Sequence, residues 1–180
     1  MAKSIEKSVI IIAKATDTEV YQLLKKWQIP YERVEHQAVF TVAEIDFSIE
    51  GSEVKNLLLK GKRSKNYYLV ICSGNKRLDI KALAKMLAER HLSFASETEL
   101  FDSLGLEKGS VTPLALSHDT LHQINLIIDQ TIDQTQKIGF HPNINTTTLV
   151  ITFSDFKRFL ANLSIEPKYL TIPSKPLDTH

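Results

Sequence analysis

The chain has 180 residues, of which 43% are hydrophobic and 24% charged, and its formal net charge is +1. This length fits one domain with a core that needs no disulfide to support it, and the near-neutral charge excludes a molecule that binds nucleic acid over its whole surface. We expect one domain over residues 1–165, followed by a flexible tail at 166–180 that carries three of the six prolines.

The sequence contains nothing that indicates secretion or a membrane. Its single cysteine, Cys72, cannot form an internal disulfide. The apolar run near the N-terminus, residues 9–13, is too short for the core of a signal peptide or for a membrane span. The expected location is therefore the cytoplasm.

The first predicted helix can be capped by Thr16 or Asp17 and is stopped by Pro30. A short strand is expected at 31–35, and one or two helical turns at 42–46. The spacing of apolar residues predicts that the buried stripe of the first helix consists of Val20, Leu23, Leu24 and Trp27.

Residues 54–60 and 66–72 are two apolar runs that predict strands, and residues 61–65 supply the turn between them. The pair is typical of an antiparallel hairpin with a basic loop. Five cations and no acid lie within eleven residues, which indicates either a solvated face or a local RNA-binding patch. These cations are Lys55, Lys60, Lys62, Arg63 and Lys65.

Two further helices are predicted from their caps. Asp79 can cap a helix whose buried stripe includes Leu83. Ser96 and Glu99 have the spacing of a capping box, and Gly105 ends the helix that they begin.

The C-terminal half predicts strands at 123–129 and 146–152, with irregular stretches at 109–113 and 140–145. Ser154 is expected to cap a final helix that faces inward with Phe156, Phe159 and Leu160. Because strands and helices mix without regular alternation, the expected class is α+β. We expect a mostly antiparallel mixed sheet, or an open barrel, packed by helices.

Several kinds of site are disfavoured. The sequence has no Gly-rich nucleotide loop, no His-Glu-x-x-His, no paired cysteines and no Gly-x-Ser-x-Gly. Cys72 lies within an apolar strand and is expected to be a buried structural thiol. His118 and His122 are four residues apart but lack a third ligand nearby, so no metal and no cofactor are expected.

Three segments carry groups that could do chemistry, and each has a plain structural alternative. Lys55 interrupts an apolar strand, where it needs water, an anion or a partner, or else it simply faces outward while Asn56 points to the opposite face. Residues 109–113 can line a small pocket with backbone amides, or form an ordinary connection. Residues 141–148 combine an imidazole, two amides and three hydroxyls, or form a capped turn.

Taken together and in order, these segments resemble the YbaK/prolyl-tRNA-synthetase-associated family of aminoacyl-tRNA deacylases. The matching segments are VKNLLLK at 54–60, YYLV at 67–70, GSVTPL at 109–114 and FHPNINT at 140–146. The resemblance extends over residues 18–163 and is greatest to the free-standing prolyl-tRNA deacylase branch. It implies the fold of the editing domain and the removal of alanine from proline tRNA.

The resemblance also implies roles for individual residues. It places Lys55, Asn56 and His141 in the catalytic set. One departure is Val54, because members of this branch often carry threonine before the lysine. The residues that it implies for substrate binding are Gly109, Ser110, Val111, Thr112, Pro113 and Asn145.

An aminoacyl ester hydrolyses readily, so such a protein needs to place water against the carbonyl and stabilise the oxyanion rather than supply a covalent nucleophile. We expect Lys55 to anchor the charged 3′ end and the loop at 109–113 to hold the aminoacyl group. The cations expected to meet tRNA phosphates are Lys60, Lys62, Arg63 and Lys65.

Two other functions stay open at this point. One is a deacylase with a different preference, such as cysteine on proline tRNA. The other is a non-catalytic module that binds tRNA or a synthetase. Prolyl-tRNA synthetase is a possible partner in each case, and no membrane partner is expected.

Overall fold

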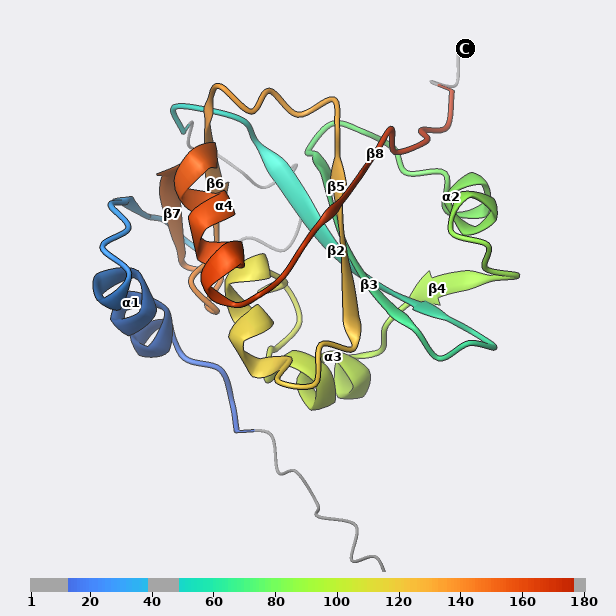
Figure 1. Ribbon diagram of the computed structural model, residues 1–180, viewed down its shortest axis with the longest axis horizontal. Helices are drawn as coiled ribbons and strands as arrows, with labels where there is room; N and C mark the ends of the chain where they lie inside the picture. Colours follow the sequence, from blue (N-terminus) through green and yellow to red (C-terminus); the bar gives the residue numbers. More distant parts are fainter. Residues whose placement is uncertain (1–12, 39–48, 177–180) are drawn as a thin grey trace, which may run out of the picture.

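The computed structural model describes residues 13–38 and 49–176, and Figure 1 shows two β-sheets packed with helices. The helices are α1 (Asp17–Lys26), α2 (Ile80–Met86), α3 (Glu97–Leu104), the 3-10 helix η2 (Pro113–His118) and α4 (Phe153–Asn162). The strands are β1 (Glu32–Glu35), β2 (Val54–Gly61), β3 (Tyr67–Ser73), β4 (Leu92–Phe94), β5 (Ile124–Asp129), β6 (Lys137–Phe140), β7 (Thr147–Thr152) and β8 (Lys168–Leu170). No helix in the described part of the chain is long and apolar enough to cross a membrane.

The strands form a three-stranded sheet, in the order β1-β7-β6, and a five-stranded sheet, in the order β4-β2-β3-β5-β8. Four of the six strand pairings are antiparallel, while β5 runs parallel to β3 and β8 runs parallel to β5. Neither sheet closes into a barrel within the described residues. The predicted α+β class with a mostly antiparallel mixed sheet is confirmed.

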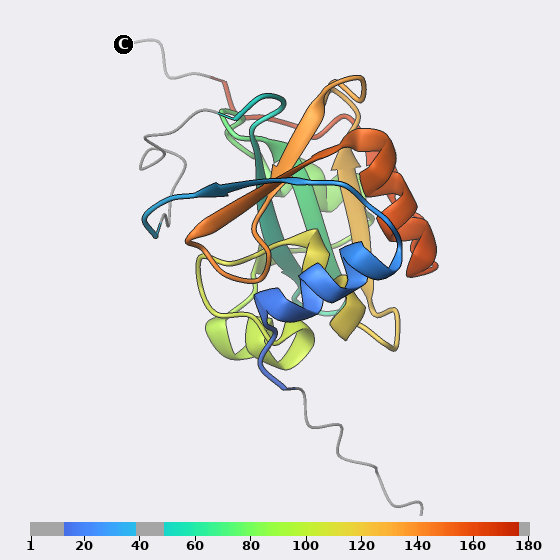
Figure 2. The same cartoon turned by 90° about the vertical axis from the view of Figure 1, so that its left-hand side faces the viewer.

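The larger sheet is buried on both faces. Alternate residues of a strand point to opposite sides, so Leu69 and Ile71 of β3 enter a main core that also receives α1, α3 and α4. Val70 and Cys72 enter a smaller core covered by α2. Figure 2 shows β1 and β7 crossing in front of the larger sheet, on the side of the main core.

The predicted caps and the predicted hairpin are present. Thr16, rather than Asp17, caps α1, in a capping box with Glu19. The helix ends before Pro30 is reached, because Gln28 adopts a left-handed conformation with φ 52°. The strands β2 and β3 pair antiparallel around the basic turn, and Gly105 ends α3 with φ 67°.

The cap of α4 differs from the prediction. Thr152, not Ser154, precedes the helix with extended backbone, and its Oγ1 accepts the backbone N–H of Asp155 at 3.1 Å. Ser154 is already inside the first turn, where its hydroxyl lies 3.0 Å from that of Thr152. Serine and threonine are both favoured N-cap residues, so the residue types do not distinguish the two positions. The cap is Thr152 because the extended backbone of β7 ends there.

Three short strands, β4, β6 and β8, have no counterpart in the predicted elements. The strand β8 lies within the predicted flexible tail, where the structure instead pairs residues 168–170 with β5 and buries Ile172. The tail is held because Asp79 donates its backbone N–H to the carbonyl of Pro173 at 2.9 Å. The helical turns predicted at 42–46 lie outside the described residues.

Candidate functional site

A pocket of about 450 Å³ opens beside β2, at the point where its neighbour β4 ends. The strand β4 pairs only with residues 59–61 of β2, so the edge of β2 from Val54 to Leu57 has no strand partner within the described part of the chain. The pocket lies between this free edge, the start of α3 and the loop before η2. Its lining is Asn56, Leu57, Leu58, Phe94, Ala95, Ser96, Glu97, Leu100, Lys108, Gly109 and Val111.

Asn56 contributes a side-chain amide to the lining of this pocket. Its side-chain amide donates a hydrogen bond from Nδ2 to the carbonyl of Val111 at 3.2 Å. The other end of the amide, Oδ1, is buried and has no hydrogen-bond partner among the residues described. A buried polar atom without a partner is costly, so this oxygen is a group whose hydrogen bonding is incomplete in the described structure.

The loop at 109–113 is shaped by its two end residues. Gly109 has φ 85°, a conformation that favours glycine, and it lines the pocket together with Val111. Thr112 is fully buried and caps η2, because its Oγ1 accepts the backbone N–H of Leu114 at 3.2 Å. Ser110 and Pro113 are buried as well. The structure therefore divides the predicted loop into two lining residues and three supporting ones.

Lys55 and Asn56 point to opposite faces of the larger sheet. Lys55 is directly opposite Cys72 in the register of β2 and β3, and its Nζ donates a hydrogen bond to the carbonyl of Lys76. The ammonium group is half-buried and has no acidic partner within residues 13–38 and 49–176. The structure thus brings Asn56 and the Gly109 loop together, and places the Nζ of Lys55 on the other side of the strand.

His141 lies at the end of β6, outside the pocket lining. Its Nδ1 donates to the carbonyl of Thr147 at 2.9 Å, which leaves Nε2 as the acceptor of the neutral ring. Burial lowers the pKa of His141 below 6.5, and the nearby His36, whose ring centroid is 5.7 Å away, lowers this pKa further. The ring is therefore neutral near pH 7. Asn145, predicted to bind substrate, is half-buried in the same turn.

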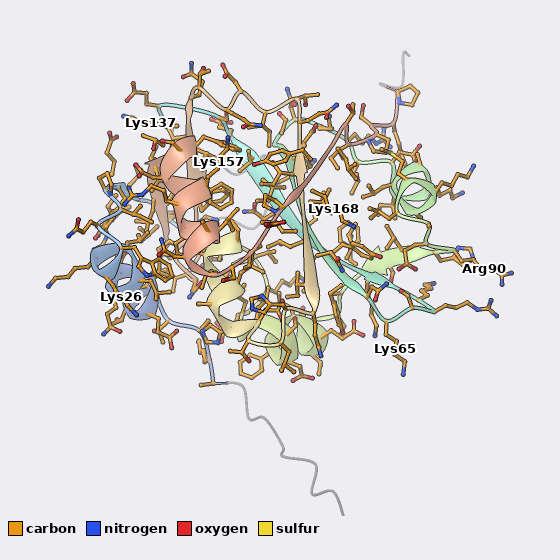
Figure 3. All side chains as sticks on the ribbon, in the orientation of Figure 1. Lys26, Lys65, Arg90, Lys137, Lys157 and Lys168 are labelled. Carbon is orange, nitrogen blue, oxygen red and sulfur yellow. The ribbon has the colours of Figure 1, made fainter. Side chains whose placement is uncertain are left out.

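The basic turn projects from the far end of the β2–β3 hairpin. Lys60 forms an ion pair with Glu99 of α3 and lies over the ring of Tyr67. The three other cations, Lys62, Arg63 and Lys65, are exposed. The turn before β4 lies beside them, because Lys62 donates its backbone N–H to the carbonyl of His91 at 3.0 Å. Figure 3 shows Lys65 and Arg90 extending outward from this end of the molecule.

Cys72 and His118, which the sequence disfavours as a nucleophile and as a metal ligand, are both held in interactions with the rest of the fold. Burial raises the pKa of the Cys72 thiol to about 11, so this residue is a poor nucleophile at neutral pH. His118 is bonded through Nε2 to a carboxylate oxygen of Glu19 at 3.2 Å. No group of three or more histidine, cysteine or acidic side chains is placed to hold a metal ion in the portion described.

Comparison with known proteins identifies the family to which this fold belongs. Residues 36–159 match the family model of the aminoacyl-tRNA editing domain. The chain belongs to the aminoacyl-tRNA editing domain family. The resemblance noted in the sequence is confirmed.

The names of relatives of this chain refer to prolyl-tRNA editing or to an association with prolyl-tRNA synthetase. The chain is 31% identical over 140 residues to the prolyl-tRNA editing protein ProX of Acetoanaerobium sticklandii, covering 76% of this chain and 85% of ProX. It is 33% identical over 156 residues to prolyl-tRNA synthetase associated domain-containing protein 1 of Mus musculus, covering 83% and 92% of the two chains. A solved structure of a protein proposed as a trans-editing enzyme for prolyl-tRNA synthetase shares the fold, with a TM-score of 0.62 at 18% identity, and covers 91% of this chain and 100% of its own.

Several lining residues of the editing-domain pocket were not singled out from the sequence. Phe94 and Ser96 come from the short strand β4 and the turn after it, and Glu97 and Leu100 come from α3. Lys108 precedes the glycine of the loop, and its Nζ lies 3.4 Å from Glu97 at the pocket mouth. The capping box at Ser96 was visible in the sequence, but its position beside Asn56 depends on how β4 pairs with β2.

Proposed function

We propose that this editing domain hydrolyses the ester of a mischarged tRNA, with alanyl-tRNA(Pro) as its preferred substrate. The observation that carries the proposal is Asn56, which lines a small pocket bounded by the Gly109 loop and whose buried Oδ1 lacks a partner in the described residues. The names of the relatives support tRNA as the substrate and proline tRNA as its identity.

The reaction needs no covalent intermediate with the protein. Water attacks the carbonyl carbon of the aminoacyl group, the oxyanion forms, and the bond to the ribose oxygen then breaks to release amino acid and tRNA. The protein contributes by holding the ester in place and by donating hydrogen bonds to the oxyanion. A free hydroxyl of the terminal ribose is close enough to the ester within the substrate itself to help activate the water.

We assign different parts of the aminoacyl group to Asn56 and to the loop at 109–113. The free Oδ1 of Asn56 can accept a hydrogen bond from the α-ammonium group, which only donates. Backbone amides between Gly109 and Pro113 are the donors that we assign to the ester oxygen. Ser110 and Thr112 support this loop from beneath. Asn145 is assigned to substrate binding on the family resemblance.

Lys55 is assigned to the charged 3′ end of the tRNA. Its ammonium group has three donors, and the carbonyl of Lys76 accepts one hydrogen bond from it. Because the edge of β2 beside it has no strand partner within the described residues, the side chain can pass around this edge to the pocket side. His141 is proposed as a positioning residue, since its Nδ1 is already bonded to Thr147.

Selectivity for a small amino acid is proposed to come from the pocket walls. Leu57, Leu58 and Leu100 supply apolar surface next to Asn56. A single methylene changes binding by only about 1–3 kcal/mol, so exclusion of the larger proline side chain requires a steric limit. The loop at Val111, held to Asn56 by its carbonyl, is the wall that we assign to this limit.

The exposed cations of the hairpin turn are proposed to meet tRNA phosphates. Exposure leaves three of these side chains available for this contact, namely those of Lys62, Arg63 and Lys65. Lys60 must first break its ion pair with Glu99. Binding through them weakens as salt is raised. We also propose that the protein acts in the cytoplasm, alongside prolyl-tRNA synthetase.

The test is single-turnover deacylation of alanyl-, cysteinyl- and prolyl-tRNA(Pro) by the parent chain and by Asn56→Ala, Lys55→Ala and Lys85→Ala. We expect the alanyl ester to be cleaved at least tenfold faster than the prolyl ester. Asn56 and Lys55 are assigned to positioning the substrate, and misplacement of a reacting group can cost about 100-fold, so Asn56→Ala and Lys55→Ala are each expected to lower the rate by about that factor. Lys85 is exposed on α2, and its variant should keep the parental rate.

Each outcome has a definite meaning. If no ester is cleaved faster than in buffer, the chain is a non-catalytic module and the enzymatic proposal is wrong. If the cysteinyl ester is preferred, the reaction stands and the assigned substrate is wrong. If Lys55→Ala retains the parental rate, the role given to Lys55 is wrong, and the side chain is explained by its bond to Lys76.

A further inference from the structure

Phe94 is a large apolar side chain left in solvent at the rim of the pocket. It is 58% exposed and is the last residue of β4, opposite Leu59 of β2. It lines the same pocket as Asn56 and Gly109. Single exposed apolar residues are common on protein surfaces, so the exposure of Phe94 does not by itself indicate a function. What requires an explanation is that this exposed ring lines the same pocket as Asn56, an amide whose buried oxygen lacks a partner among the described residues.

The basic turn lies on the same pair of strands as Phe94. Leu59 pairs with Phe94, Gly61 pairs with Leu92, and Lys62 is bonded to His91. At about 3.4 Å per residue, the three steps from Leu59 to Lys62 place the backbone of the basic turn roughly 10 Å along the strand from the position opposite Phe94. The cations at this end are Lys62, Arg63, Lys65 and Arg90.

An aromatic ring between a cationic surface and a small polar pocket matches the end of a single RNA strand. Unpaired bases stack on aromatic side chains, while their phosphates bind to nearby cations. The acceptor end of an aminoacylated tRNA has these parts in the same order, with phosphates first, then the terminal adenine, and the ester on its ribose. Lys108, which lines the same pocket, adds a further cation to this region.

We propose that Phe94 is the stacking platform for the terminal adenine of the substrate tRNA. This inference rests on the proposed function and names the part of the substrate that the rim binds. The stacked base would hold the ribose at the pocket mouth, so that the ester reaches Asn56 while the backbone continues toward the hairpin turn. Phe94 is in this sense a positioning residue, since the ester itself is held by other groups.

The first test measures the base directly. The terminal adenine of tRNA(Pro) is replaced by 2-aminopurine, whose fluorescence is quenched by stacking, and uncharged tRNA is titrated with the protein. We expect quenching by the parent chain and by Phe94→Tyr, and little quenching by Phe94→Ala. The matched control is Phe101→Ala, at a phenylalanine of α3 that is 36% exposed and outside the pocket lining, and it should quench as the parent does.

The second test separates binding from cleavage. Removing a stacked base contact weakens affinity roughly 5- to 150-fold, so Phe94→Ala should raise KM for alanyl-tRNA(Pro) within that range, with a smaller change in kcat. An alanyl ester of ribose without the base should be cleaved equally by the parent chain and by Phe94→Ala, because it has nothing to stack.

The two proposals can fail separately. If the parent chain cleaves alanyl-tRNA(Pro) while Phe94→Ala shows parental KM and parental quenching, the stacking proposal is overturned and the proposed function stands. If the parent chain cleaves no ester but quenching still depends on Phe94, the function is wrong and the platform stands as an RNA-binding feature. Equal quenching loss in Phe94→Ala and Phe101→Ala would indicate a general structural defect and would overturn the assignment to Phe94.

Discussion

The burial of His141 makes the stability of the folded protein depend on pH. Its imidazole is largely enclosed and bonded to the carbonyl of Thr147, and burial is the main reason why its pKa lies below 6.5. A histidine with a lowered pKa in the folded state binds its proton more readily after unfolding. The stability that it contributes is therefore present above the unfolded pKa and is lost as the pH falls through the folded pKa.

We predict that replacing His141 with Gln reduces the loss of stability on acidification. The parent chain should lose free energy of unfolding between pH 7 and pH 5, and His141→Gln should lose less, because glutamine does not take up a proton. Urea unfolding at pH 7, 6 and 5 measures this difference. His122→Gln, at an exposed histidine, is the control. Identical pH dependence in the parent chain and His141→Gln would contradict the prediction.

At the level of the element, local sequence determines where helices begin more reliably than it determines which of two neighbours caps them. The capping box of Ser96 and Glu99 was readable from spacing alone and is present. The cap of α4 was assigned to Ser154, while the structure uses Thr152. The reason is that β7 keeps extended backbone through Thr152, so the first helical residue comes two positions earlier than expected.

We predict that Thr152→Ala lowers the free energy of unfolding by about 1 kcal/mol, the usual cost of losing an N-cap. Ser154→Ala should cost less than about 0.5 kcal/mol, as for an exposed position without a special role. Both side chains are exposed, so neither substitution opens a cavity. Denaturant unfolding compares the two variants, and a larger effect at Ser154 would show that the cap is misassigned.

At the level of the whole molecule, a buried ion pair joins three distant segments. Lys76, after β3, lies 2.6 Å from a carboxylate oxygen of Asp129 at the end of β5, and it also donates to the carbonyl of Ile172 at 3.0 Å. The side chain of Asp129 is fully buried and that of Lys76 is 16% exposed. This pair holds the C-terminal segment against the larger sheet, and the backbone carbonyl of Lys76 also accepts the hydrogen bond from Lys55.

We predict that Asp129→Asn destabilises the protein by about 3–5 kcal/mol, because it leaves the Lys76 charge buried without its partner. The matched control is Glu107→Gln, which removes the acid of an exposed pair with Lys14 and should cost under about 1 kcal/mol. Chemical denaturation of both variants provides the comparison. Similar, small losses in the two would show that the pair does not hold the fold together.

Sequence by itself determined the features that depend on neighbours along the chain. The α+β class, the capped helices and the β2–β3 hairpin follow from apolar spacing and turn residues. The segments at 54–60, 109–114 and 140–146 also indicated the family, because their order and composition are properties of the chain alone. Glycine at position 109 permits an unusual backbone, and its φ is 85°.

Only the tertiary structure decided which of these residues meet. Strand alternation sends Asn56 toward Val111 and Lys55 toward Lys76, and the register of the whole sheet sets which face is which. The parallel pairing of β5 with β3, the docking of β8 and the placement of Phe94 at the pocket rim all depend on contacts between residues far apart in sequence. Such contacts are selected by burial over the entire fold, and no local pattern in the chain specifies them.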